Sequence, residues 1–152
     1  MELKNYGIMS DEEIDVIIKE LKNGDSEKGR VPEYKFKILL HNTDVEIEIG
    51  HINLRLGNSE KVENYIGHVG YGINEEYRGK KYAAKACNII KNVIKDNSLN
   101  KVIITCNPDN FASRSICESI GAKLIEIIDI PTSSDAYSKT EPQKCRYEWI
   151  ID

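Results

Sequence analysis

Alternation of apolar and polar residues constrains this chain most, because it commits long stretches to half-buried strands. Three runs in the first half, over 34–40, 45–49 and 52–56, place an apolar residue at every second position. Such period-two runs predict strands that bury one face. The phase slips by one residue at Gly50-His51, which predicts a bulge within a long strand. The alternation over 145–151 predicts a last strand in the same way.

Three segments carry the signals of helices. Ser10-Asp11-Glu12-Glu13 is typical of a capping box, and the apolar residues from Ile14 to Leu21 follow at helical spacing. A second helix is predicted from Tyr82 to about Ile94. A third is predicted to begin at Asp109 or Asn110 and to end at Ile120, before Gly121.

The remaining segments complete an α+β pattern. Strands are predicted over 65–73, 101–106 and 123–130, and the loop over 131–143 leads to the last strand. The expected order is a helix, a hairpin of strands, and then strand–helix–strand–helix–strand–strand. This order predicts a mixed sheet with helices on its faces.

Length and composition set the class of protein. A chain of 152 residues can bury roughly 69% of its unfolded surface, so one core over 1–152 can form without metals or disulfides. A net charge of −4 disfavours a general nucleic-acid binder. No apolar run approaches membrane-spanning length and no apolar leader opens the chain, so we expect a cytosolic protein. The four cysteines form no C-x-x-C pair, and we expect reduced, mostly buried thiols at positions 87, 106, 117 and 145.

The charge is uneven, and the exception lies at a junction between strand and helix. Residues 78–101 hold seven basic side chains and one acidic side chain. At the junction, Arg78, Lys80 and Lys81 surround Gly79, just before the second predicted helix. A helix start presents free N–H groups and partial positive charge, so this junction is a candidate phosphate site. The spacing excludes a Walker A loop and a dinucleotide fingerprint, while a solvated basic helix start is the alternative.

Two motifs resemble the GNAT acetyltransferase superfamily. Arg78-x-x-Lys81-x-Ala83 resembles its acetyl-CoA pyrophosphate loop, Arg/Gln-x-x-Gly-x-Gly/Ala. Lys81 stands where that pattern has a glycine, three residues after the arginine. The segment from Asn110 to Gly121 resembles the pattern Asn-x-x-Ala-x-x-Leu-Tyr-x-x-x-Gly of its fourth helix. The resemblance implies a single GNAT-type domain over 1–152, with a mixed, mostly antiparallel sheet. It also implies a splayed strand pair that binds coenzyme A.

The resemblance further implies an N-acetyltransferase that uses acetyl-CoA as cosubstrate and no metal. The acceptor is expected to be a primary amine of a small molecule or peptide. Pyrophosphate would lie on the backbone amides from Gly79 to Ala83, and the pantetheine arm along the strand before them. The implied cofactor-binding residues are Tyr71, Gly72, Ile73, Arg78, Gly79, Lys80, Lys81, Tyr82, Ala83, Asn110 and Ser113.

Catalysis of this kind needs a base for the amine and a proton source for the thiolate. His68 is the first candidate base, because imidazole titrates near neutral pH; a structural histidine is the alternative. Weaker candidates on the earlier strand are Glu46, Glu48 and His51. The family often uses a tyrosine of the fourth helix as proton source, and that position is Cys117 here. Tyr137, in the last loop, is a second candidate.

Other functions stay open at this stage. A non-catalytic acyl-CoA-binding sensor or interaction module of the same fold is the main alternative, because Cys117 replaces the tyrosine. A nucleic-acid surface on the basic helix is disfavoured, since no set of stacking aromatics accompanies it. The acidic N-terminal half is compatible with a cationic acceptor or with ordinary surface charge. A monomer or a homodimer is expected, with no membrane partner.

Overall fold

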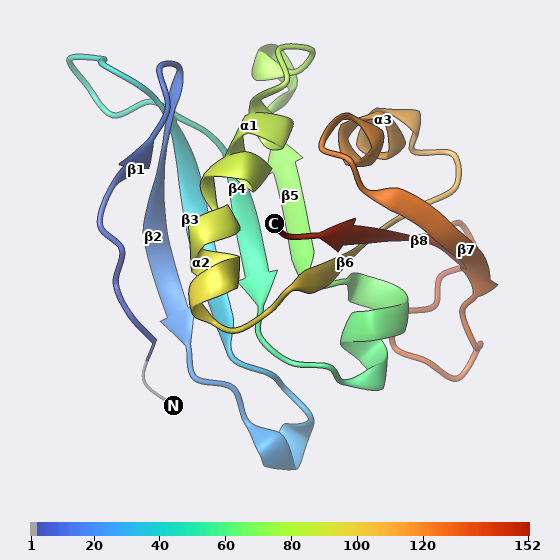
Figure 1. The fold of residues 1–152 in the computed structure, drawn as a ribbon. Coiled ribbons are helices and arrows are strands. Elements are labelled where there is room, and N and C mark those ends of the chain that lie inside the picture. The colour runs from blue at the N-terminus through green and yellow to red at the C-terminus, as the bar shows by residue number, and fades with distance from the viewer. Residues whose placement is uncertain (1–2) are drawn as a thin grey trace.

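A computed structural model describes residues 3–152 as one eight-stranded sheet with helices packed against it (Figure 1). The strands are β1 (Met9–Ser10), β2 (Ile14–Lys22), β3 (Glu33–Leu40), β4 (Glu48–Arg55), β5 (Val69–Ile73), β6 (Lys101–Cys106), β7 (Lys123–Asp129) and β8 (Gln143–Ile150). The α-helices are α1 (Tyr82–Ile89), α2 (Lys91–Asp96) and α3 (Phe111–Ser119). The strand order is β1-β2-β3-β4-β5-β6-β8-β7. Among the strands of residues 3–152, only the β5–β6 pair is parallel, so the predicted mixed, mostly antiparallel sheet is confirmed.

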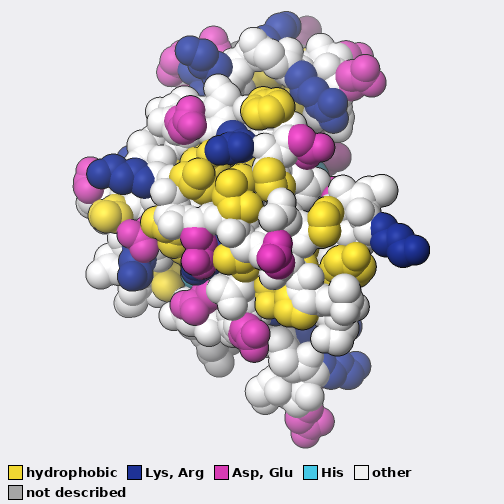
Figure 2. Space-filling view, turned by 90° about the vertical axis from the view of Figure 1, so that its right-hand side faces the viewer, with side chains coloured by type: hydrophobic (Ala, Val, Ile, Leu, Met, Phe, Trp, Pro, Cys, Tyr) yellow, Lys and Arg dark blue, Asp and Glu magenta, His cyan; other side chains and the backbone are white. Residues whose placement is uncertain are grey.

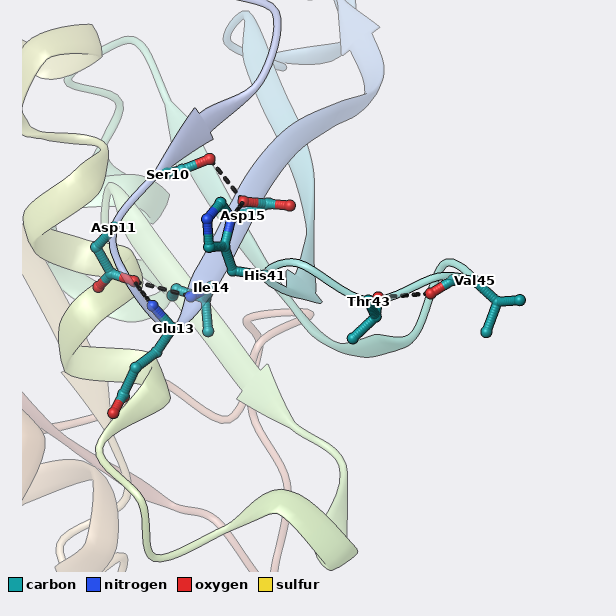
Figure 3. Close-up of polar contacts among 8 residues, drawn as sticks. All are labelled: Ser10, Asp11, Glu13, Ile14, Asp15, His41, Thr43 and Val45. Atoms are coloured by element: carbon teal, nitrogen blue, oxygen red, sulfur yellow. Dashed lines mark hydrogen bonds and ion pairs between the residues drawn. The ribbon is translucent and has the colours of Figure 1, made fainter.

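The predicted first helix is wrong, because its residues form β2. Asp11 Oδ1 accepts hydrogen bonds from the backbone N–H groups of Glu13 and Ile14, at 2.7 and 2.8 Å (Figure 3). The Asp11 N–H also donates to the Ile14 carbonyl, which closes a turn between β1 and β2. The acidic cluster therefore caps a hairpin turn, which uses the same side-chain-to-backbone bonds as a helix cap.

The predicted bulge is confirmed, one residue before the expected place. Ile38 pairs with Gly50 and Leu39 with Glu48, so Ile49 is the extra residue. Ile49 and Gly50 are consecutive and both buried, and burial then continues at alternate residues of β4. The strand begins only at Glu48, so residues 45–47 of the predicted run belong to the turn.

The second predicted helix is present but broken at Ile90, where α1 passes into α2. Its predicted apolar face is confirmed, since Ala83, Ala86, Ile90 and Val93 are all buried. α1 contacts β2, β4, β5 and α3, and Figure 1 shows α1 and α2 running along one face of the middle strands. α3 ends before Gly121, whose φ is +91°, as the sequence predicts.

The strand predicted over 65–73 is shorter than expected. β5 begins at Val69, and a π-helical turn occupies Val62–Ile66 before it. Short 3-10 helices lie at Ser26–Lys28 and Glu75–Tyr77. The late strands β6, β7 and β8 follow the prediction closely, and Cys145, Tyr147 and Trp149 of β8 are buried at alternate positions.

All four cysteines are free and buried, as expected from their spacing. Within residues 3–152, no helix has the length and apolar character needed to cross a bilayer. The same residues contain no cluster of three or more His, Cys, Asp and Glu side chains suited to a metal ion. The core is instead one apolar cluster that runs from Leu3 to Ile151 and draws on most of the strands and helices.

Candidate functional site

The two parallel strands in the middle of the sheet touch at one end only. β5 and β6 share one bridged pair, Val69 with Ile104. By contrast, β4 and β5 pair at five positions, and β6 and β8 pair at six. Beyond Val69 the strands diverge toward their carboxyl ends. The splayed pair expected from the sequence resemblance is therefore present.

A cavity of about 260 Å³ occupies this splay. It is lined by residues of β5 and β6, the start of α3 and the last loop: Val69, Gly70, Tyr71, Ile104, Thr105, Cys106, Asn107, Asn110, Ser113, Glu141 and Lys144. A cleft between the carboxyl ends of adjacent parallel strands is a common ligand position in α/β sheets.

The loop before α1 contains two residues with positive φ. Gly79 has φ +83°, and Lys81 has φ +65° and ψ +21°, which is the left-handed conformation. Lys81 is the N-cap of α1, and no side chain caps the helix. Arg78 is exposed, and its Nε donates to the Ile73 carbonyl at 2.8 Å, which ties the loop to the end of β5. The lysine thus takes the conformation that a glycine would take more easily.

The start of α3 brings Asn110 and Ser113 to the cavity. Asn110 Oδ1 accepts the Ser113 N–H at 3.1 Å, as the N-cap of the helix. Ser113 Oγ lies 2.9 Å from the Tyr71 hydroxyl, so β5 and α3 are joined by side chains across the splay. The sequence resemblance assigned only the backbone of Tyr71 a role.

Glycine at position 72 has a reason in the sheet itself. A Cβ at Gly72 would lie 2.6 Å from Cε1 of His51 on the neighbouring strand. At Gly70, by contrast, a Cβ would lie 3.6 Å from the nearest atom, Nη1 of Arg55. The cross-strand histidine ring therefore occupies the space beside Gly72, whereas Gly70 leaves space on the sheet.

The predicted base, His68, is buried at the closed end of the splay. Its Nδ1 accepts the Ile103 N–H at 2.9 Å, and its Nε2 lies 2.8 Å from Asn58 Oδ1. Nε2 therefore carries the proton and donates to Asn58, which leaves no free lone pair on the ring. Burial lowers the pKa of His68 and keeps the ring neutral. This geometry supports the structural alternative for His68.

The two predicted proton sources also lie outside the residues that line the cavity. Cys117 is buried, and burial raises the pKa of its thiol to about 12. Its Sγ lies 3.6 Å from the Tyr71 hydroxyl. Tyr137 lies in the last loop, and its N–H donates to the Ser134 carbonyl. The last loop instead presents Glu141 to the cavity, a residue that carries no sequence signal because its loop has no periodic pattern.

The weaker candidates lie away from the cavity. Glu46 and Glu48 are exposed, as predicted, and Glu46 pairs with Lys37 at 3.0 Å. His51 is exposed on β4, against Gly72.

A larger cavity of about 740 Å³ lies along the β2–β3 connection. It reaches Arg55 and Val62, and Asp135 borders it from the last loop. Arg55 approaches Gly70 from this side, and Gly70 lines the smaller cavity. Residues of the two linings, Arg55 and Gly70, are therefore neighbours in the sheet.

Comparison with known proteins agrees with this geometry. Residues 4–123 match a family model described as "Acetyltransferase (GNAT) domain". An uncharacterized N-acetyltransferase of Bacillus subtilis, YnaD, is 26% identical over 122 residues, which cover 77% of this chain. An acetyltransferase of the GNAT family from Bacillus anthracis has a TM-score of 0.58 at 24% identity and covers 77% of this chain and 66% of its own. RimL, a ribosomal L7/L12 alpha-N-protein acetyltransferase solved with coenzyme A, has a TM-score of 0.59 at 16% identity over 79% of this chain and 63% of its own.

The match does not extend over the whole of these relatives. The chain spans 62% of the length of YnaD. The structural likenesses, all below 25% identity, concern the fold alone.

Proposed function

The chain belongs to the GNAT acetyltransferase family, and on that premise we propose that residues 1–152 act as one domain that transfers the acetyl group of acetyl-CoA to a primary amine. The observation that carries the proposal is the uncapped start of α1, which lies at the end of the splayed β5. Free N–H groups and Arg78 favour a diphosphate there, and the cleft beside it suits an extended arm.

In this proposal each part of the chain has a binding role. The amides from Gly79 to Ala83 hold the pyrophosphate, with charge from Arg78, Lys80 and Lys81. The backbone of Tyr71, Gly72 and Ile73 and the side chain of Asn110 hold the pantetheine arm. Bound acetyl-CoA supplies a thioester that an amine can attack directly.

The cavity offers two side chains for proton control. Burial raises the pKa of the Tyr71 hydroxyl, so it stays protonated and can donate a hydrogen bond to a departing thiolate. The Glu141 carboxylate borders the same cavity and is the candidate base for the amine. We assign these roles in preference to His68, Cys117 and Tyr137, none of which lines the cavity.

The acceptor is a primary amine of a small molecule or peptide in this proposal. Its proposed path is the larger cavity beside the β2–β3 connection, because Arg55 of that cavity lies next to Gly70 of the cleft.

Calorimetric titration with acetyl-CoA tests the loop assignment. The double variant Arg78→Glu, Gly79→Pro reverses one charge and removes a φ of +83°, which proline cannot adopt. We expect affinity to fall at least about 100-fold, equal to about 2.7 kcal/mol, with the circular dichroism spectrum unchanged. Lys95→Glu is the matched control, because Lys95 is an exposed basic residue at the far end of the same helical segment. Unchanged affinity in the double variant refutes the loop assignment.

Release of free coenzyme A with a panel of amines tests the chemistry separately. We expect Glu141→Gln and Tyr71→Phe each to lower turnover without changing acetyl-CoA affinity. This result would support Glu141 as the base and Tyr71 as the hydrogen-bond donor to the thiolate. Acetyl-CoA binding without release over the panel would assign the chain to the non-catalytic acyl-CoA-binding alternative.

A further inference from the structure

The larger cavity, which the proposed function gives to the acceptor, is lined by more basic than acidic side chains. Its basic residues are Lys22, Lys28, Arg30, Arg55 and Lys61, and its acidic residues are Asp25, Glu33 and Asp135. The cavity includes the β2–β3 connection, which lies at the lower end of the molecule in Figure 1. Figure 2 shows charged side chains of both signs at that end, below the gathered hydrophobic side chains. An acceptor that enters here meets charged side chains.

Two of the three carboxylates in this lining already have basic partners. Glu33 Oε2 lies 3.7 Å from Arg55 Nε, and Asp135 Oδ2 lies 2.9 Å from Lys61 Nζ. Asp25 caps the short 3-10 helix that follows it, with a backbone N–H bonded to its Oδ1 at 3.1 Å. The lining therefore offers an ammonium group little negative charge that is not already in use.

Two of the basic side chains, by contrast, have no acidic partner. Lys28 and Arg30 are exposed, and in the part of the chain that the structure describes no carboxylate lies within 4.0 Å of either. Lys22 pairs with Glu20 at 4.0 Å, outside the lining. The charge that remains for a ligand in this cavity is therefore mainly positive.

Arg55 brings a further positive group to the edge of the cleft. Its Nη1 donates to the carbonyls of Ile66 and Gly67, each at 3.1 Å, and its Nε faces Glu33. Among residues 3–152 its Nη2 has no hydrogen-bond partner, and Nη2 lies 4.0 Å from the position that a Cβ on Gly70 would take. The side chain is only 21% exposed. An anion at Nη2 would complete the hydrogen bonding of a largely buried cation.

The face of the sheet beside Gly70 carries another unpaired cation. Asn53 of β4 pairs with Gly70 on one side and with Lys35 of β3 on the other, so the three residues form a row on one face. Lys35 is half-buried, and it too has no carboxylate within 4.0 Å among the described residues. Arg55 lies two residues along β4 from Asn53 and shares this face. The surface next to the cleft is therefore basic as well.

We propose that the acceptor amine carries an anionic group of its own, a carboxylate or a phosphate, which Arg55 and Arg30 bind in the larger cavity while the amine reaches the cleft. Arginine binds either anion through paired N–H groups. The inference rests on the proposed function, because it takes the larger cavity as the path of the acceptor. It disfavours a polyamine, although the acidic N-terminal half by itself is compatible with a cationic acceptor.

Matched amines with and without an anionic group test the proposal. Aminoethyl phosphate is compared with ethanolamine, and glycylglycine with glycylglycinamide, as acceptors of the acetyl group. We expect kcat/KM to be higher for the anionic member of at least one pair by at least about tenfold, the effect of one hydrogen bond between charged groups. The pair that shows the preference identifies the anion as phosphate or carboxylate. Calorimetric titration of the same amines into the protein saturated with coenzyme A measures the preference as affinity, without turnover.

Substitution of the two arginines tests the assignment. Arg30→Gln and Arg55→Gln should each lower the preference for the anionic amine about tenfold. Arg30 is exposed and Arg30→Gln should keep the fold, whereas circular dichroism must confirm the fold of Arg55→Gln, which loses its bonds to Ile66 and Gly67. Lys123→Gln is the matched control, because Lys123 is an exposed basic residue of β7 outside the lining, and this variant should keep the wild-type preference.

The outcomes separate this inference from the proposed function. Equal kcat/KM and equal affinity within both pairs, a preference for the neutral amines or for a diamine, or a preference that survives both arginine variants would each overturn the inference. Acetyl-CoA binding with no release of coenzyme A in the presence of any amine would overturn the proposed function instead. In that case the affinities alone decide whether the cavity selects an amine with an anionic group.

Discussion

At the scale of single residues, the left-handed backbone of Lys81 lowers the stability of the fold. A non-glycine residue with left-handed backbone loses about 1–2 kcal/mol, while glycine costs about 0.5–1 kcal/mol of unfolded-state entropy. Its φ of +65° therefore predicts that Lys81→Gly raises the free energy of unfolding by about 0.5–1 kcal/mol. Urea unfolding of the two proteins measures this difference.

Lys80→Gly is the control for this prediction, because Lys80 has no positive φ. It removes the same charge from the same loop, yet it should leave stability unchanged or lower it by up to about 1 kcal/mol. Equal changes in both variants would show that charge, and not backbone conformation, sets the stability of the loop.

At the scale of elements, the turn into β5 depends on one glycine. Gly67 has φ +73°, and a Cβ there would lie 2.8 Å from the Ile103 carbonyl oxygen of β6. We expect Gly67→Ala to lower the free energy of unfolding by about 2–4 kcal/mol, from backbone strain plus the clash. Gly29→Ala isolates the strain, since Gly29 has φ +67° and nothing within 4 Å, and it should cost only about 1 kcal/mol. Thermal unfolding of both variants gives the difference, and equal losses would exclude the clash as a cause.

The elements also show what the sequence could and could not predict. Strands β3 and β8 were predictable because period-two burial and turn residues agree at both, and β6 was predictable because it is a short, mostly apolar run. The segment from Ile14 to Ile18 was wrongly predicted as a helix, because its apolar spacing suits a helix as well as a strand. Its β-branched residues favour a strand, and the antiparallel pairing with β3 decides the matter.

The candidate site also has one part that the sequence could predict and one part that it could not. The loop before α1 has a local signal in the sequence, since glycine and basic residues meet at a helix start, and two of its residues have positive φ. The cavity beside it is formed by residues distant in the chain, such as Tyr71, Ser113 and Glu141. Only the tertiary fold brings these side chains together, so sequence spacing could not select them over His68 or Cys117.

At the scale of the whole molecule, the sheet has two parts that His68 helps to join. β5 and β6 share one bridged pair. Beside it, the backbone N–H of His68 donates to the Ile103 carbonyl, and the ring Nδ1 of His68 accepts the backbone N–H of Ile103. Protonation of the ring would break this second bond in the middle of the molecule. The stability of the whole fold should therefore depend on pH through this one side chain.

The direction follows from the pKa of His68, which burial lowers below its ordinary value of 6.5. Below pH 6.5 the His68 imidazole binds a proton more readily in the unfolded chain than in the folded chain. The contribution of His68 to the free energy of unfolding is therefore complete above pH 6.5 and is lost as the pH falls. For wild type, the free energy of unfolding should fall relative to His68→Asn by up to about 1.4 kcal/mol per pH unit below that point, because asparagine still accepts the Ile103 N–H but does not titrate. His51→Asn, at an exposed histidine, should follow the wild-type curve. Parallel curves for wild type and His68→Asn would mean that the imidazole titrates equally in both states and does not act as the joint between the two parts of the sheet.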